Sequence, residues 1–126
     1  MILGTGIDIV EIRRLANSIQ RYGDAFLNRV YAHDELAIAP AAEATRAAFL
    51  AGRWAAKEAV SKAFGTGIGA SCAMTDVVVT NDDAGKPMLE LRGNAAETAR
   101  RLGIATIHIS ISHERDYAVA QAIAEN

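Results

Sequence analysis

The sequence has a single cysteine, Cys72, and only two prolines among its 126 residues. One cysteine cannot form a disulfide within the chain, which fits a protein of the reducing cytoplasm. No apolar stretch approaches the roughly 20 residues that a membrane-spanning helix needs. The basic residues near the N-terminus follow its apolar run, which is the reverse of a secretory signal. We therefore expect a cytoplasmic protein with no membrane partner.

An excess of charge of one sign is also lacking. The net charge is only −2, which argues against nucleic acid as a partner. Residues 1–62 nevertheless carry a net charge of +1, and residues 63–126 carry −3. Positive charge is thus local, and it favours an acidic surface or a phosphorylated small molecule as the partner. The Walker A, GxGxxG, CxxC, HExxH and GxSxG motifs are all absent.

The pattern of apolar residues predicts one α+β domain over residues 1–126, because 51% of the residues are hydrophobic and no linker-like run interrupts them. We expect an antiparallel sheet packed on one long helix. Asn94 is expected to cap the helix that it begins. The expected elements are strands at 2–10, 75–80, 88–91, 105–112 and 117–124, helices at 11–22 and 94–102, and short helical turns at 24–38.

The most informative segment is Arg46–Gly69, which reads as one long helix ended by glycines. Glu58 and Lys62 lie one turn apart on one face. They could form an ordinary surface pair worth about 0.3 kcal/mol, or they could serve an anionic ligand and a metal. Two further faces follow from 3.6 residues per turn: a basic face of Arg46, Arg53 and Lys57, and an apolar stripe of Phe49, Gly52, Ala56, Ala59, Val60 and Ala63.

Asp8 lies inside the apolar N-terminal strand, where Gly4 and Gly6 allow a neighbouring element to approach closely. A buried carboxylate is costly unless it is paired or bound to a metal, although a position near solvent at the strand end would also explain it. Together with Glu58, Asp8 would offer two carboxylates to a hard cation. His113, at the end of the strand at 105–112, is either a phosphate ligand or a solvated residue.

Four segments resemble a known family: GTGIDIVEI, FLAGRWAAKEAVSKAFGTGIG, GKP and HISISHERDYAVAQAI. In this order they are similar to the holo-(acyl-carrier-protein) synthases, the small phosphopantetheinyl transferases. The resemblance spans nearly the whole chain. It implies a homotrimer with active sites between subunits. It also implies magnesium-dependent transfer of 4′-phosphopantetheine from coenzyme A to a serine of apo acyl carrier protein, with release of adenosine 3′,5′-bisphosphate, in support of fatty acid biosynthesis.

The resemblance also implies roles for individual residues. Asp8 and Glu58 would hold magnesium, and Lys62 would face the transferred phosphate; these three form the expected catalytic set. Arg53 and His113 would contact the nucleotide part of coenzyme A. The base that accepts the proton of the carrier serine would be Glu58 or a metal-bound water that it holds.

Three more basic residues complete the expected sites. Arg46 joins the nucleotide contacts mainly because it shares the helix face of Arg53. Arg14 and Arg21 lie seven residues apart on an exposed helix face, and the resemblance makes them the docking surface for the acidic carrier protein. A non-catalytic coenzyme A binding module and a trimeric scaffold remain alternatives, but a chain of either kind would not need the catalytic set described above.

Overall fold

A computed structural model describes all 126 residues. Every expected element is present, with ends shifted by at most two residues except in the long helix, which runs from Glu43 to Phe64. The chain order is β1 (Ile2–Glu11), α1 (Ile12–Tyr22), α2 (Asp24–Val30), α3 (His33–Ala37), α4 (Glu43–Phe64), η1 (Met74–Asp76), β2 (Val77–Asn81), β3 (Pro87–Leu91), α5 (Gly93–Arg101), β4 (Thr106–His113) and β5 (Tyr117–Glu125).

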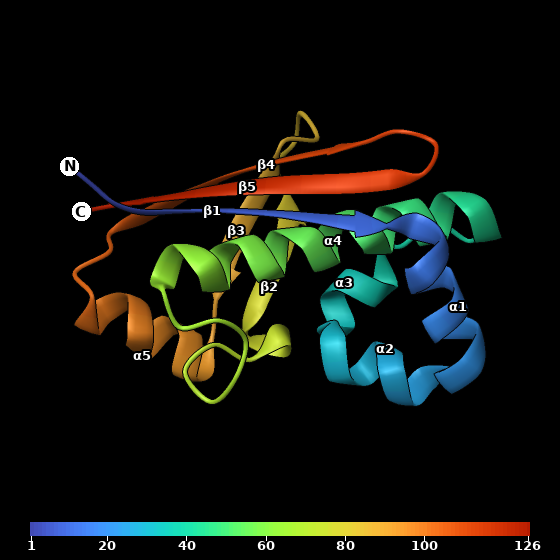
Figure 1. The fold of residues 1–126 in the computed structure, drawn as a ribbon, viewed down its shortest axis with the longest axis horizontal. Coiled ribbons are helices and arrows are strands. Elements are labelled where there is room, and N and C mark those ends of the chain that lie inside the picture. The colour runs from blue at the N-terminus through green and yellow to red at the C-terminus, as the bar shows by residue number, and fades with distance from the viewer.

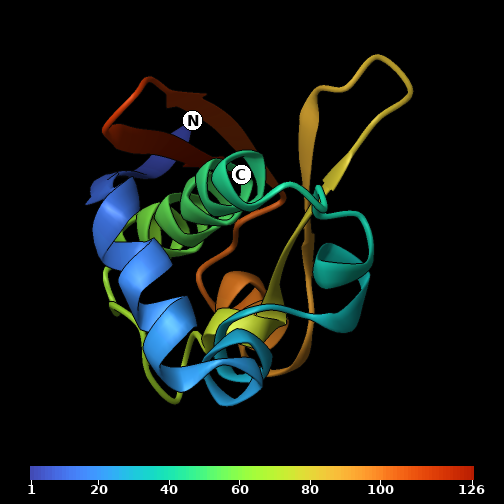
Figure 2. The same ribbon diagram turned by 90° about the vertical axis from the view of Figure 1, so that its right-hand side faces the viewer.

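The α+β fold is confirmed, and its five strands divide between two antiparallel sheets. One sheet has the order β1-β5-β4, and the other is the hairpin of β2 and β3. Figure 1 shows the three-stranded sheet lying along α4. Figure 2 shows the β2–β3 hairpin extending away from it, beyond the body of the protein. The larger sheet therefore leaves its outer face uncovered within one chain.

Small residues bring the larger sheet very close to α4. A Cβ atom built on Gly6 would lie 1.8 Å from the backbone oxygen of Ala59, and one built on Gly4 would lie 2.1 Å from that of Ala63. The close approach expected at these two glycines is confirmed. Strand β5 continues the pattern, because the side chains that it turns toward α4 are buried alanines: Ala118, Ala120, Ala122 and Ala124.

Helix α4 buries its expected apolar stripe and leaves Glu58 and Lys62 partly exposed, but the face expected to be basic is largely buried as well. Ala56, Ala59 and Val60 pack in the cluster formed with the three-stranded sheet. Leu50 and Ala51 pack in a second cluster with α1 and α2. The helix lies between two apolar layers, and local periodicity reveals only one of them. No helix of the protein has both the length and the apolar character that crossing a membrane requires.

The expected cap of α5 is also wrong. The helix begins at Gly93, and the backbone N–H of Asn94 donates to the carboxylate of Asp76 at 3.2 Å. The side-chain amide of Asn94 instead donates to the backbone oxygen of Ala70 at 3.0 Å. Asp76 thus supplies the negative group at the helix N-terminus from a distant position in the sequence.

Candidate active site

The structure brings Asp8 and Lys62 into direct contact. Strand alternation turns Gly6 and Asp8 toward α4 and leaves Ile7 exposed. The Lys62 Nζ lies 3.0 Å from Asp8 Oδ1 and donates a second hydrogen bond to the backbone oxygen of Ile7 at 2.9 Å. The Asp8 side chain is 15% exposed and that of Lys62 is 49% exposed. The ion pair therefore offsets the cost of a carboxylate in an apolar strand.

Glu58 lies one helical turn before Lys62. Its half-buried carboxyl is affected by the charges of both Asp8 and Lys62. Burial raises the pKa of Glu58, the Asp8 carboxylate raises it further, and Lys62 opposes both. The negative charges of Asp8 and Glu58 repel each other, and both groups lie near solvent. A hard cation bound to their oxygens would relieve this repulsion. No third acidic, histidine or cysteine side chain completes a metal cluster. A hard cation held by these two carboxylates would take its remaining oxygens from water and from a bound phosphate group.

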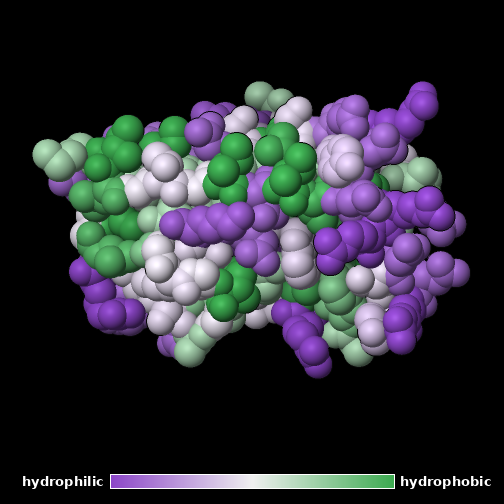
Figure 3. All heavy atoms as spheres, in the orientation of Figure 1, coloured by the Kyte–Doolittle hydropathy of each residue, from purple (hydrophilic) through white to green (hydrophobic).

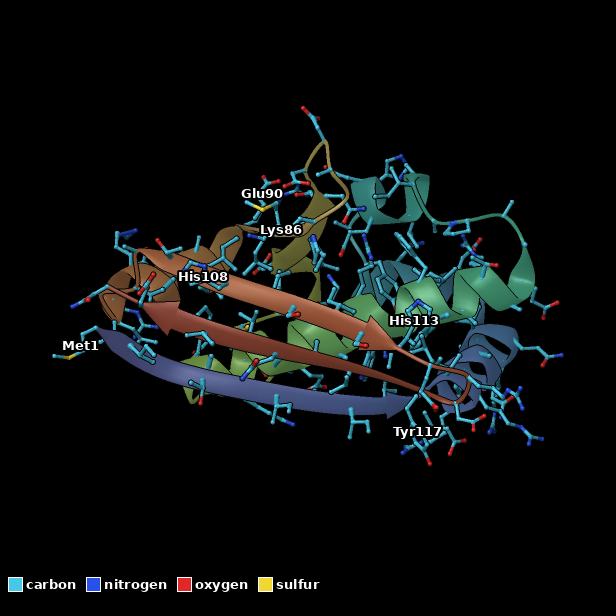
Figure 4. The ribbon with its side chains drawn as sticks, turned by 90° about the horizontal axis from the view of Figure 1, so that it is seen from above. Met1, Lys86, Glu90, His108, His113 and Tyr117 are labelled. Carbon is cyan, nitrogen blue, oxygen red and sulfur yellow. The ribbon has the colours of Figure 1, made fainter.

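Arg53 and His113 line a second site, a cleft of about 1090 Å³ between α4, the start of α1 and the β4–β5 turn. Figure 4 shows His113 beside α4, at the opposite end of β4 from His108. The guanidinium carbon of Arg53 lies 3.6 Å from the ring centroid of Phe49. Burial lowers the pKa of Arg53, and the negative charge of Glu35 opposes this. Arginine stays charged in proteins, so the cleft wall holds a buried cation suited to an anionic ligand.

The two sites lie on opposite sides of α4. Arg53 and Lys62 are nine residues apart, which turns their side chains about 180° from each other and separates them by roughly 13 Å along the axis. Asp8 is on β1 and His113 is on β4, with β5 between these two strands. The structure therefore unites Asp8, Glu58 and Lys62 in one place and Arg53 and His113 in another, and one chain does not join the two groups.

The remaining expected residues lie elsewhere. Arg46 lines a separate pocket of about 150 Å³ between α1 and α4. It is not among the residues that line the larger cleft. Arg14 and Arg21 are exposed on α1, as the sequence predicted. Their role in docking stays a prediction.

Lys57 lies on the same face of α4 as Arg53, but the expectation that it contributes a free positive charge to that face is wrong. Its side chain is fully buried, and its Nζ lies 2.7 Å from the Glu35 carboxylate and 2.9 Å from the backbone oxygen of Met74. Burial lowers the pKa of Lys57, and Glu35 opposes this. Glu35 precedes Lys57 by 22 residues, so no local pattern could have revealed the pair.

Sequence reasoning missed two neighbours of Arg53. Phe49 appeared only as part of the apolar stripe, although a residue four positions before Arg53 on a helix is placed to stack with it. Asn81 lies just after the strand expected at 75–80 and was given no functional role, but its Oδ1 accepts a hydrogen bond from the Arg53 Nη2 at 3.3 Å. No signal in the sequence connects Asn81 with α4.

A pair of carboxylates beside an ammonium, together with a cleft whose wall holds a buried arginine, is an arrangement suited to an enzyme that acts on a phosphorylated ligand. Residues 4–122 match the model of the 4′-phosphopantetheinyl transferase superfamily, and the chain belongs to this family. It is 49% identical over 130 residues to the holo-(acyl-carrier-protein) synthase of Edwardsiella ictaluri, covering 98% of each chain.

Solved structures agree with this assignment. The holo-(acyl-carrier-protein) synthase of Neisseria meningitidis is 34% identical, with a TM-score of 0.92 and full coverage of both chains. That of Bacillus anthracis, in complex with CoA (3′,5′-ADP), is 38% identical with a TM-score of 0.83 and covers 98% of this chain and 96% of its own.

Proposed function

We propose that the protein is a holo-(acyl-carrier-protein) synthase that transfers 4′-phosphopantetheine from coenzyme A to a serine of apo acyl carrier protein. The observation that carries this proposal is the grouping of Asp8, Glu58 and Lys62 at a partly exposed position in a member of this family. A coenzyme A binding module would need only the cleft of Arg53 and His113. The products are the holo carrier, which fatty acid biosynthesis requires, and adenosine 3′,5′-bisphosphate.

The reaction exchanges one phosphorus–oxygen bond for another. The serine oxygen forms a bond to the phosphorus that carries pantetheine, and the bond from that phosphorus to the bridging oxygen breaks. The leaving bisphosphate takes the bridging oxygen and its electron pair. Catalysis of this kind depends mainly on positioning and charge neutralisation, and Lys62 Nζ supplies a cation beside the transferred group.

Asp8 and Glu58 would hold the magnesium ion, which supplies Lewis-acid stabilisation of pyrophosphate charge when bound. Asp8 also fixes the Lys62 ammonium through their 3.0 Å contact. The proposed acceptor of the serine proton is Glu58 or a metal-bound water that it holds.

The test of this function is a transfer assay. The purified protein is incubated with coenzyme A, magnesium and an apo acyl carrier protein, and the carrier is weighed by mass spectrometry. The carrier should gain the mass of phosphopantetheine, and the gain should require both coenzyme A and a divalent cation. An unmodified carrier after exhaustive incubation, with coenzyme A binding intact, would leave only the binding-module alternative.

We further propose that the working enzyme is a homotrimer whose active sites combine two subunits. The first support is the outer face of the larger sheet, where Ile7 and Ile9 are 62% and 64% exposed. Figure 3, which views this sheet edge-on, shows hydrophobic patches near its upper edge and around the N-terminal end. Apolar patches of this kind mark interfaces. The second support is the separation of the two sites across α4 within one chain. In a trimer, the Arg53 of one subunit would lie beside the Asp8 of its neighbour, so that two subunits together form a complete site.

Mixing two inactive variants tests this arrangement. Asp8→Ala lacks the carboxylate site, and the double variant Arg53→Ala with His113→Ala lacks the cleft. After joint refolding in equal amounts, about a quarter of the sites should contain both intact groups. We expect turnover to recover to about that share of the wild-type rate, and light scattering to give three times the chain mass of 13.4 kDa. Absence of recovery in a mixed trimer would place both groups of each site in one subunit.

A second prediction concerns the carrier protein. Changing Arg14 and Arg21 together to glutamate should raise the KM for the carrier strongly and leave coenzyme A affinity nearly unchanged, because both side chains are exposed on α1 and lie outside the cleft. The wild-type KM should also rise with salt, since exposed charges are screened over about 10 Å at moderate ionic strength. Steady-state kinetics with varied carrier measures both effects. If the KM for the carrier changes neither with salt nor on charge reversal, α1 is not part of the docking surface.

A further inference from the structure

Arg53 is held in the cleft wall by very few partners. It is 7% exposed, its guanidinium lies over Phe49, and its single side-chain hydrogen bond runs from Nη2 to Asn81 Oδ1. Its Nε is buried without a hydrogen-bond partner. An arginine has five N–H donors in a fixed planar fork, and buried donors without acceptors are costly. The guanidinium therefore keeps donors for an acceptor that enters the cleft, and its orientation is set by the Phe49 ring and by one polar group, the Asn81 amide.

Asn81 is itself fixed by the buried Glu35–Lys57 pair. It is the last residue of β2. Glu35 Oε2 accepts a hydrogen bond from the backbone N–H of Val79 at 3.0 Å, and Lys57 Nζ donates to the backbone oxygen of Val77. The pair thus ties β2 to α4 immediately before Asn81. Both side chains are fully buried, so this connection is rigid.

Lys57 lies one helical turn after Arg53, so α4 carries both the cation of the cleft and the group that anchors β2. Two contacts therefore hold the end of β2 at a defined distance from Arg53. One is the hydrogen bond from Lys57 to the backbone oxygen of Val77, and the other is the hydrogen bond from Arg53 to Asn81. We propose that Asn81 is a positioning residue that orients the Arg53 guanidinium toward the 3′-phosphate of coenzyme A and so makes the enzyme select coenzyme A over 3′-dephospho-coenzyme A. The inference rests on the proposed function for the identity of the ligand.

Titration calorimetry with the two ligands tests this. Arg53→Ala should weaken coenzyme A by about ten- to a hundredfold, the loss of a charge-assisted phosphate contact. Asn81→Ala should weaken it by about three- to tenfold, and should change the affinity for 3′-dephospho-coenzyme A little. In the Arg53→Ala background, Asn81→Ala should add nothing. In turnover, Asn81→Ala should raise the KM for coenzyme A and leave kcat unchanged. Asn28→Ala, an exposed asparagine on α2, is the matched control.

Other results overturn the proposal. If Asn81→Ala keeps the wild-type ratio of coenzyme A affinity to 3′-dephospho-coenzyme A affinity, the Asn81 amide does not act on Arg53. An equal loss for both ligands, or a further loss in the Arg53→Ala background, would show that Asn81 acts by another route. The comparison does not depend on catalysis. If the wild-type protein binds coenzyme A but leaves the carrier unmodified, the proposed function is refuted, and the ratio of the two affinities still tests the role of Asn81. If the protein binds neither ligand, the proposed function and the role of Asn81 are both refuted.

Discussion

Asp8→Ala should lower turnover by about a hundred- to a thousandfold, because the proposed role of Asp8 as a metal ligand is worth several kcal/mol in the transition state. The substitution removes one of the two carboxylates and also releases Lys62 from its 3.0 Å contact. The fold should persist, because the backbone of Asp8 stays paired with Ala120 in the sheet and a small apolar residue suits this strand.

The measurement is kcat with the apo carrier at limiting and saturating magnesium, beside circular dichroism to establish folding. Glu58→Gln should behave similarly, since it keeps the size of the side chain and removes the charge. Asp83→Ala is the matched control, because Asp83 is exposed in the β2–β3 turn. Near-normal turnover of folded Asp8→Ala at limiting magnesium would exclude Asp8 from the metal site.

The residues of the proposed catalytic set could be picked out because the local sequence contains a signal for each of them. A carboxylate between Ile7 and Ile9 is conspicuous in any strand, and Glu58 and Lys62 are neighbours on any helix. The structure adds the contact between the two segments, which lie 54 residues apart. Apolar runs bounded by turn residues also located the strands, and alternation marked the strand at 105–112, because a half-buried strand repeats with period two.

The environment of the cleft could not be predicted from the sequence, because residues distant in the sequence determine which charged side chains are paired in the core and which line the cleft. Lys57 and Arg53 occupy the same helix face, yet Glu35 neutralises the first within the core and the cleft exposes the second to a ligand. Helical periodicity assigns both to one face and cannot supply the partner. The same limit applies to α5, whose N-terminal acceptor is Asp76 and not the adjacent Asn94. How the strands divide between two sheets is likewise a property of tertiary packing.

Gly6→Ala should cost at least about 3 kcal/mol of unfolding free energy, the upper part of the range for overpacking in a rigid core. The added Cβ would lie 1.8 Å from the Ala59 backbone oxygen and 2.8 Å from the Ala63 backbone nitrogen. Both obstacles are helix backbone, which cannot rotate away as a side chain can. Strand β1 must then move off α4, or the chain must fail to fold.

Urea unfolding of Gly6→Ala and Gly69→Ala gives the matched comparison, since a Cβ on Gly69 would meet nothing within 4 Å. Gly69→Ala should stay within about 0.5 kcal/mol of the wild type. Because Asp8 follows Gly6 by two residues on the same strand face, any movement of β1 also separates Asp8 from Lys62. The folded fraction of Gly6→Ala at low temperature should therefore lose turnover as well as stability. Wild-type stability and turnover in this variant would mean that β1 does not lie on α4 as closely as the two glycines allow.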